Sequence, residues 1–176
     1  MSIQFDFKKS NLIKGVTIIT PSISLDERGN IWTSYLEGEM VELLPKGLNF
    51  KHDKFSFSKK NVLRGIHGDS KSWKLVTCIF GVIQQVVVDL RADSPTYLQW
   101  ESFDIDSNNP KLILIPPRMG NAYYVHSKEA VYHYKLAYKG SYIDAVDQIS
   151  IPWNNKKIGI QWKAKHPILS TRDNES

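Results

Sequence analysis

The sequence predicts a mostly β fold, a sandwich or barrel of short and chiefly antiparallel strands. Runs rich in Val, Ile, Thr and aromatic residues recur along the chain, and turn residues separate them about every 8 to 12 positions. The strands do not alternate with helical segments, which disfavours a Rossmann-type α/β fold. A chain of 176 residues can bury a core without metals or disulfides, so we expect one domain over residues 1–176.

The N-terminal quarter of the chain contains two expected strands and one expected helix. Residues 15–23 are rich in Val, Ile and Thr, which favours a strand, and the polar segment 26–29 then turns the chain at a permissive glycine. Residues 31–35 resume as a strand. Residues 37–44 show apolar spacing typical of one or two helical turns, and the Pro-Lys-Gly segment 45–47 ends them.

The other expected strands are rich in β-branched or aromatic residues and are bounded by turn signals. In chain order they are residues 50–58, 62–67, 75–80, 82–90, 97–105, 112–115, 122–125 and 130–138. Gly81 separates two of these runs and signals a hairpin or a bulge. The tail from residue 141 contains two tryptophans and is too apolar to be disordered, so we expect it to pack on the barrel.

Charge and composition limit the classes of partner. The formal net charge is +5, but lysines and arginines are scattered without a run of four, which disfavours nucleic acid and fits a phosphorylated small molecule or an ordinary solvated surface. There is no run of 18 apolar residues and no signal-like N-terminus, so we expect no membrane contact and a cytoplasmic protein. The single cysteine, Cys78, lies in an apolar run and reads as a buried core thiol.

Residues 61–80 carry the strongest indication of a reaction site. Arg64 can hold a phosphate, His67 can move protons near neutral pH, and Lys74 can stabilise an oxyanion. The alternative is a structural histidine and an edge lysine whose stem packs on the barrel. The His-x-His pair with a following Glu that many metal-binding barrels carry is missing here, so we expect no metal ligand at His67.

Three tyrosines share one face of the expected strand 130–138 because their spacing is even. Tyr132, Tyr134 and Tyr138 could line a barrel interior, and a phenol there could also act as a general acid. His126 and His133 fall at different parities and read as structural residues. On its own pattern Asp173 would be dismissed as a charge near the C-terminal end of the sequence.

Seven motifs occur in order along the chain. They are Asp26-x-Arg28-Gly29, Val62-Leu-Arg-Gly-x-His67, Lys74-Leu-Val, Asp89-x-Arg91-x-x-Ser-Pro-Thr96, Ile115-Pro-Pro, Tyr134-Lys135 and Pro167-Ile-Leu-Ser-x-x-Asp173. In order and spacing they resemble the dTDP-4-dehydrorhamnose 3,5-epimerase family over nearly the whole chain. Each motif alone is modest, but seven in register are specific.

The resemblance implies a cupin-type jelly-roll β-barrel with a few short helices, a homodimer with exchanged N-terminal strands, and no cofactor or metal. It implies His67 as the base paired with Asp173, Tyr134 as the acid on the other sugar face, Lys74 at the enolate oxygen and Arg64 at the diphosphate. The other expected substrate contacts are Arg28, Glu27, His52, Lys54, Ser56, Asn121 and Tyr138.

The chain departs from the family pattern in two segments. A histidine is usual where this chain has Gly120-Asn121-Ala122, and a Gln-x-Asn set is usual where it has the segment 52–56. The variant looks more like epimerases that act on GDP-linked 4-keto heptoses for capsular polysaccharide.

The leading hypothesis is therefore an epimerase that inverts C3, or C3 and C5, of a nucleotide-linked 4-keto heptose or 6-deoxy sugar through an enolate. The carrier nucleotide is expected to be GDP. The alternatives are a sugar-nucleotide 3,4-ketoisomerase and a non-catalytic cupin that binds sugar nucleotides.

Overall fold

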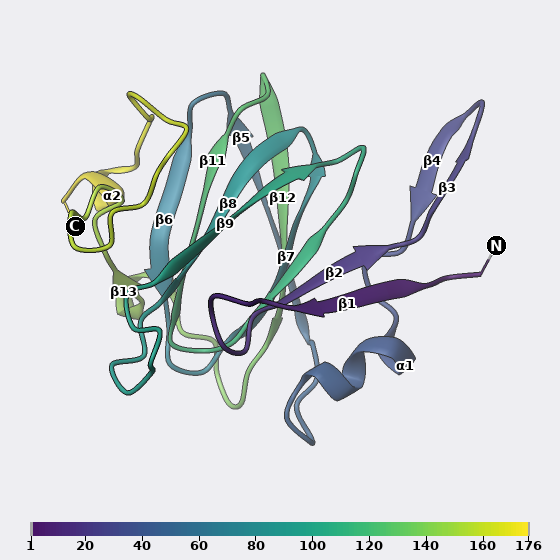
Figure 1. Cartoon of the computed structure of the whole chain (residues 1–176), viewed down its shortest axis with the longest axis horizontal. Helices are drawn as coiled ribbons and strands as arrows, with labels where there is room; N and C mark the ends of the chain where they lie inside the picture. The colour runs from purple at the N-terminus through teal and green to yellow at the C-terminus, as the bar shows by residue number, and fades with distance from the viewer. Residues whose placement is uncertain (1, 176) are drawn as a thin grey trace.

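The computed structural model describes residues 2–175 and shows two antiparallel sheets that face each other, with a separate hairpin at one side (Figure 1). The six-stranded sheet consists, in spatial order, of β1 (Phe5–Lys9), β2 (Thr17–Pro21), β10 (Leu112–Ile115), β7 (Trp73–Phe80), β12 (Glu129–Ala137) and β5 (His52–Lys59). The five-stranded sheet consists of β13 (Ile149–Ser150), β6 (Leu63–Gly68), β11 (Met119–Val125), β8 (Val82–Asp89) and β9 (Trp100–Asp106). The prediction of a mostly β fold is confirmed.

The remaining elements are short and lie outside these sheets. They are the hairpin of β3 (Ile23–Asp26) and β4 (Gly29–Trp32), helices α1 (Glu37–Met40) and α2 (Thr171–Glu175), and 3-10 turns at Val41–Leu43 and Ala145–Asp147. The helix expected over residues 37–44 is present as α1 and the turn that follows it. Among the described residues, no helix is long and apolar enough to cross a membrane.

Three apolar clusters hold these layers together. The central cluster lies between the sheets and combines residues such as Val76 and Tyr132 from one sheet with Val87 and Tyr123 from the other. A second cluster packs α1 and its neighbours against the six-stranded sheet. A third packs the C-terminal tail, including Trp162, against the five-stranded sheet. The tail therefore covers the barrel as the sequence predicted.

Several strand boundaries differ from those that the sequence predicts. The strand expected over residues 15–23 is divided at Ser22 into β2 and β3, and β1 was not predicted at all. The hairpin interpretation of Gly81 was wrong, since β7 and β8 belong to different sheets. Gly81 instead turns the chain from one sheet to the other at φ +92°, where a Cβ atom would lie 2.3 Å from the carbonyl oxygen of Glu129.

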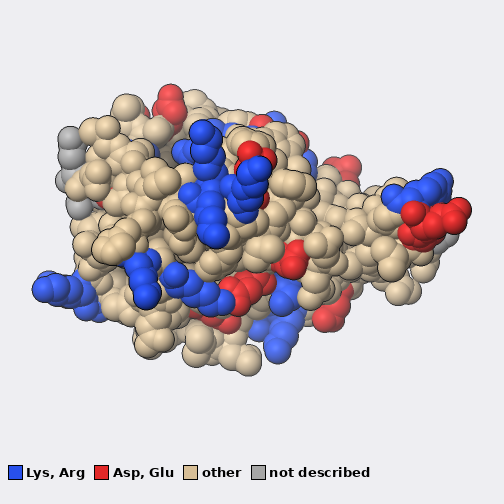
Figure 2. Space-filling view, turned by 90° about the horizontal axis from the view of Figure 1, so that it is seen from above, with Lys and Arg blue, Asp and Glu red and all other residues tan. Residues whose placement is uncertain are grey.

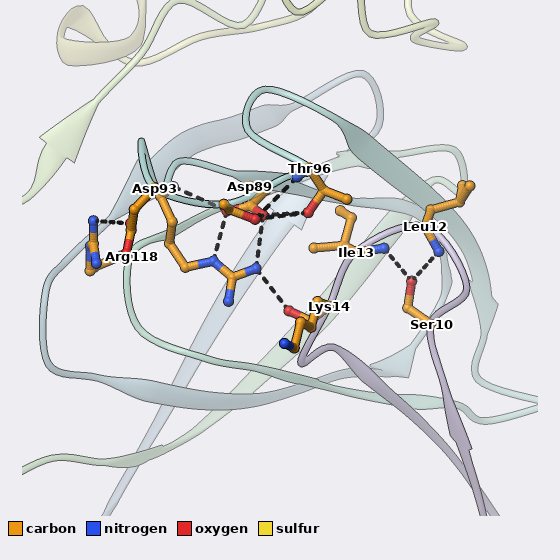
Figure 3. A network of polar contacts seen from close by, with 10 residues as sticks. Ser10, Leu12, Ile13, Lys14, Asp89, Asp93, Thr96 and Arg118 are labelled. Carbon is orange, nitrogen blue, oxygen red and sulfur yellow. Dashed lines mark hydrogen bonds and ion pairs between the residues drawn. The ribbon is translucent and has the colours of Figure 1, made fainter.

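A buried carboxylate fixes the loop between β8 and β9 (Figure 3). Asp89 is fully buried and accepts hydrogen bonds from Arg91 Nε at 2.8 Å, Ser94 Oγ at 2.6 Å and Thr96 Oγ1 at 2.6 Å. Arg91 also donates to the carbonyl of Lys14, which ties this loop to the N-terminal segment. Burial by itself would raise the pKa of Asp89, but the hydrogen bonds from these partners hold the pKa well below its usual range.

We expect the Asp89→Asn variant to lose about 3 kcal/mol of unfolding free energy at pH 7, because it leaves Arg91 without its counter-ion. The folded-state pKa of Asp89 is depressed, so its contribution is present above the unfolded pKa of about 3.9 and is lost as the pH falls below it. Urea unfolding from pH 7 to pH 3 should therefore show a flatter loss of stability in the variant than in the wild type. Asp93→Asn, at an exposed carboxylate, is the control and should change the unfolding free energy little. If stability fell as steeply with pH in Asp89→Asn as in the wild type, Asp89 would not be the source of this acid sensitivity.

Candidate active site

A cavity of about 290 Å³ lies between the two sheets and the C-terminal tail. Its lining combines residues from β5, β7 and β12 of one sheet with residues from β6 and β11 of the other. The lining residues are Lys54, Ser56, Arg64, His67, Lys74, Asn121, Tyr134, Leu136, Tyr142, Ala145, Gln148, Ser170, Arg172 and Asp173. All four residues that the resemblance gives a catalytic role are in this set.

His67 and Asp173 form the best-defined pair in the cavity. The imidazole Nε2 of His67 on β6 lies 2.6 Å from Asp173 Oδ1 on α2, and Ser170 Oγ donates to the second carboxylate oxygen at 2.9 Å. Burial would raise the pKa of Asp173, but the hydrogen bond from His67 and the one from Ser170 lower it below the usual value. A carboxylate that stays ionised fixes the imidazole orientation and stabilises the imidazolium form.

Tyr134 approaches the cavity from the opposite sheet. It lies on β12, where Tyr132, Tyr134 and Leu136 alternate toward the barrel interior, and its ring packs edge-on against Tyr132. Burial, together with the nearby phenol of Tyr123, raises the pKa of Tyr134 well above its usual value. The phenol therefore keeps its proton at neutral pH and can only donate it to a stronger base.

Lys74 brings a buried ammonium to the same cavity. Its Nζ lies 3.2 Å from Asp69 Oδ2, and both side chains are almost fully buried. Asp69 is fixed in turn by the backbone amides of Lys71 and Ser72, at 3.0 Å and 2.6 Å from its Oδ1. Burial lowers the pKa of Lys74, and the carboxylate of Asp69 opposes that shift. Asp69 is therefore the counter-ion of Lys74, a pairing that no sequence pattern predicted.

A bulge in β6 explains how two residues at odd spacing reach one cavity. Strict alternation would send the side chains of Arg64 and His67 to opposite faces of the strand. Asn121 pairs with His67 and Tyr123 pairs with Arg64, so three steps along β6 match two steps along β11. The extra residue returns both side chains to the interior.

Arg64 is held in place by hydroxyl groups. Its Nε donates to Ser58 Oγ at 3.1 Å, and Tyr123 Oη lies 3.1 Å from the same oxygen and 2.7 Å from Ser56 Oγ. Sequence reasoning missed Tyr123 because nothing in the sequence separates a strand tyrosine that packs in the core from one that bonds a site residue. It also missed the tail residues Tyr142, Gln148 and Arg172.

Four of the expected substrate contacts do not line this cavity. Glu27 and Arg28 lie at the tip of the β3–β4 hairpin, which projects away from both sheets (Figure 1). His52 and Tyr138 contact each other outside the cavity lining, with 3.3 Å between Nδ1 and Oη. Arg64, Lys54, Ser56 and Asn121 do line it.

The described residues contain no cluster of three or more His, Cys, Asp or Glu side chains that could hold a metal ion. Cys78 is buried among core residues, as predicted, and burial raises the pKa of its thiol to about 12. His133 is also buried, and it pairs with Asp53 at 2.6 Å outside the cavity.

A polar cavity enclosed by two facing antiparallel sheets places the chain in the class of cupin-type jelly-roll enzymes. A sequence profile described as dTDP-4-dehydrorhamnose 3,5-epimerase matches residues 10–176. The chain therefore belongs to the dTDP-4-dehydrorhamnose 3,5-epimerase family, as its motifs predicted, and it is an epimerase.

Individual relatives agree with this assignment. The dTDP-4-dehydrorhamnose 3,5-epimerase of Salmonella typhimurium is 36% identical over 165 residues, which cover 92% of this chain and 88% of that protein. The dTDP-4-dehydrorhamnose 3-epimerase of Streptomyces niveus is 32% identical and covers 93% and 79%. The dTDP-6-deoxy-D-glucose-3,5-epimerase of Legionella pneumophila, whose crystal structure was solved in complex with dTDP-4-keto-L-rhamnose, is 31% identical in sequence to this chain. It superposes with a TM-score of 0.89 over 98% of this chain and 92% of that one.

We expect Gly65→Ala to destabilise the protein by about 3 kcal/mol, because the new Cβ would lie 2.5 Å from Ala122 Cβ and 2.7 Å from the carbonyl oxygen of Asn121, at φ +123°. Gly140→Ala is the matched control, since Gly140 also has a positive φ (+68°) but no neighbour within 4 Å. It should cost about 1 kcal/mol. Urea denaturation compares the two, and equal losses would show that the close approach of β6 and β11 is not what requires Gly65.

Proposed function

We propose that this protein inverts a carbon next to the ketone of a nucleotide-linked 4-keto sugar. The observation that carries the proposal is the position of His67 and Tyr134, which enter one cavity from opposite sheets. Inversion through an enolate needs a base on one face of the sugar and a proton donor on the other. The proposal assigns these roles to His67 and Tyr134.

The reaction follows from the charges of these groups. His67 removes the proton α to the ketone, and the electrons of the C–H bond form an enolate whose oxygen is stabilised by the Lys74 ammonium. Asp173 stabilises the imidazolium that results. Tyr134 then gives its proton to the opposite face of the carbon. Exchange with solvent returns a proton to the phenolate and removes one from the imidazolium.

The cations of the cavity suit the diphosphate of the carrier nucleotide. Arg64 presents its guanidinium to the cavity, and Lys54 and Arg172 also line it. The two curated relatives described above are named for dTDP-linked sugars, which supports a dTDP-linked 4-keto-6-deoxy sugar over the GDP-linked heptose suggested by the sequence. Since one is a 3,5-epimerase and the other a 3-epimerase, C3 is the carbon that we propose for inversion.

The test is exchange and inversion of dTDP- and GDP-linked 4-keto sugars in deuterated water, followed by NMR. His67→Asn should lower deuterium incorporation at C3 by about 10³-fold. Tyr134→Phe should still incorporate deuterium but should return the original configuration, because the enolate forms without a donor on the far face.

His133→Asn is the matched control, because it also breaks a partly buried histidine–aspartate pair with 2.6 Å between the atoms, but outside the cavity. Unchanged exchange in His67→Asn would remove His67 from the role of base. A product with its carbonyl at C3 would instead indicate a ketoisomerase, and sugars that bind without exchange would indicate a binding protein.

We also propose a homodimer in which the β3–β4 hairpin of one subunit reaches the cavity of the other. The hairpin exposes 77% of Leu25 and 64% of Ile31, which a second copy would cover. Figure 2 shows a narrow projection on the same side, with basic and acidic side chains at its tip. Arg28 and Asp26 form an ion pair at the turn of the β3–β4 hairpin. In this arrangement Arg28 would contact the substrate of the partner subunit.

Mixing two inactive variants tests this arrangement. Arg28→Ala and His67→Asn homodimers should each be impaired, whereas subunits exchanged between them should regain about a quarter of the wild-type exchange rate. Recovery is expected because a mixed dimer contains one cavity with His67 from one chain and Arg28 from the other. Mixed dimers, confirmed by mass, that show no recovery would place Arg28 in its own subunit's site or in neither.

A further inference from the structure

A chain of buried amides and a phenol lies directly behind the cavity. Tyr132 Oη lies 2.5 Å from Gln85 Oε1, and Gln85 Nε2 lies 2.7 Å from Asn121 Oδ1. Tyr132 and Gln85 are completely buried, and Asn121 is 6% exposed. The three residues come from β12, β8 and β11, so the chain crosses from one sheet to the other.

The hydrogen bonds that link Tyr132, Gln85 and Asn121 have directions that are fixed by the backbone carbonyl of Val86. Gln85 Nε2 also lies 3.0 Å from the carbonyl oxygen of Val86, which can only accept, so this atom of the Gln85 amide must be the nitrogen. The amide oxygen therefore faces Tyr132, whose single O–H donates to it. The remaining N–H of Gln85 then points at Asn121.

Asn121 is oriented as a result. Its Oδ1 accepts from Gln85 Nε2 and lies 3.2 Å from Tyr132 Oη, so reversing the amide would place its NH₂ group against the N–H of Gln85. The amide nitrogen Nδ2 is thereby turned away from this chain. Since Asn121 lines the cavity, that nitrogen is available there as a donor.

The position of Asn121 relative to His67 determines which part of a bound sugar the amide N–H can reach. Asn121 and His67 are direct cross-strand partners on β11 and β6, so their side chains lie on the same face of the sheet at neighbouring positions. A donor on Asn121 therefore lies beside the place where His67 would meet the sugar carbon in the proposed reaction.

We infer that Asn121 determines specificity by donating a hydrogen bond to a sugar hydroxyl, at C2 or C3, beside the reaction centre of His67. Gln85 and Tyr132 act as positioning residues that keep the donor, rather than the acceptor, turned to the substrate. This inference rests on the proposed function and adds a selection rule to it. A sugar with a hydroxyl at that position is favoured, and one that lacks the hydroxyl or carries an ammonium group there is disfavoured.

Two substitutions test the donor and its orientation separately. Asn121→Asp keeps the shape and the acceptor for Gln85 but replaces the donor with an oxygen, and Gln85→Met frees Asn121 to turn. Each should lower kcat/KM for the C3 exchange reaction about 10- to 100-fold, since a polar group of the substrate is left without its partner. Gln84→Met is the control, because Gln84 is the adjacent buried glutamine but bonds Ser102 and the C-terminal tail instead.

Deoxy analogues identify the oxygen that is recognised. Wild type, Asn121→Asp and Gln85→Met are compared on dTDP-4-keto-6-deoxyglucose and on its 2-deoxy and 3-deoxy forms. On the analogue that lacks the recognised hydroxyl, wild type and both variants should have the same kcat/KM, because Asn121 then has no hydroxyl to bind. The same loss on all three sugars would overturn the inference and give Asn121 a merely structural role, as would rates for both variants equal to those of the wild type.

A binding measurement separates this inference from the proposed reaction. dTDP-6-deoxyglucose and GDP-6-deoxyglucose have no ketone and cannot react. Their affinities, measured by calorimetry, therefore report the binding contacts, including the hydrogen bond from Asn121, without any contribution from catalysis. The nucleotide sugar that wild type binds should bind about 10-fold more weakly to Gln85→Met and unchanged to Gln84→Met. Absence of exchange in wild type would refute the proposed reaction, whereas equal affinities in wild type, Gln85→Met and Asn121→Asp would refute the role of this chain.

Discussion

The close pairing of β6 with β11 is the constraint on which the rest of the site depends. The extra residue in β6 gives Arg64 and His67 a common face, and it does so where Gly65 allows the two backbones to approach. The same pairing places Asn121 beside His67. A phosphate-binding cation, a base and a directed amide therefore share one local irregularity of the sheet. Regular alternation would have left one of the first two outside the barrel.

The second feature of the site is that its buried charges are compensated before a substrate arrives. Asp173 is bonded to His67, and Asp69 is paired with Lys74. Without these partners, the cost of burying each charge would favour its neutral form. Tyr134 carries no charge and is kept neutral by burial. The cavity can therefore meet an enolate with fixed groups that need little rearrangement.

Local patterns predicted the strands and the chemistry of residues 61–80, and the seven motifs predicted the family and the four residues now found around one cavity. Strand alternation could not predict the bulge in β6, because a bulge is decided by contact with β11, which lies far away in the sequence. The link between Asp173 and His67 spans 106 positions, so only the motif pattern suggested it. The hydrogen bonds of Gln85 had no local signal at all, since a glutamine in a β-rich run reads as an exposed residue.

Two tyrosines, Tyr132 and Tyr134, stand two positions apart on β12, and this repetition has a consequence for how the strand must be aligned. Sliding β12 by two residues past its neighbours would preserve the alternation of inward and outward side chains while putting Tyr132 where Tyr134 now stands. The alternation of inward and outward side chains alone would not oppose such a slip. The irregularity between Val131 and Tyr132, where β12 pairs with β7, breaks the equivalence of the two alignments. Fidelity of strand alignment thus decides which of two chemically identical phenols enters the cavity.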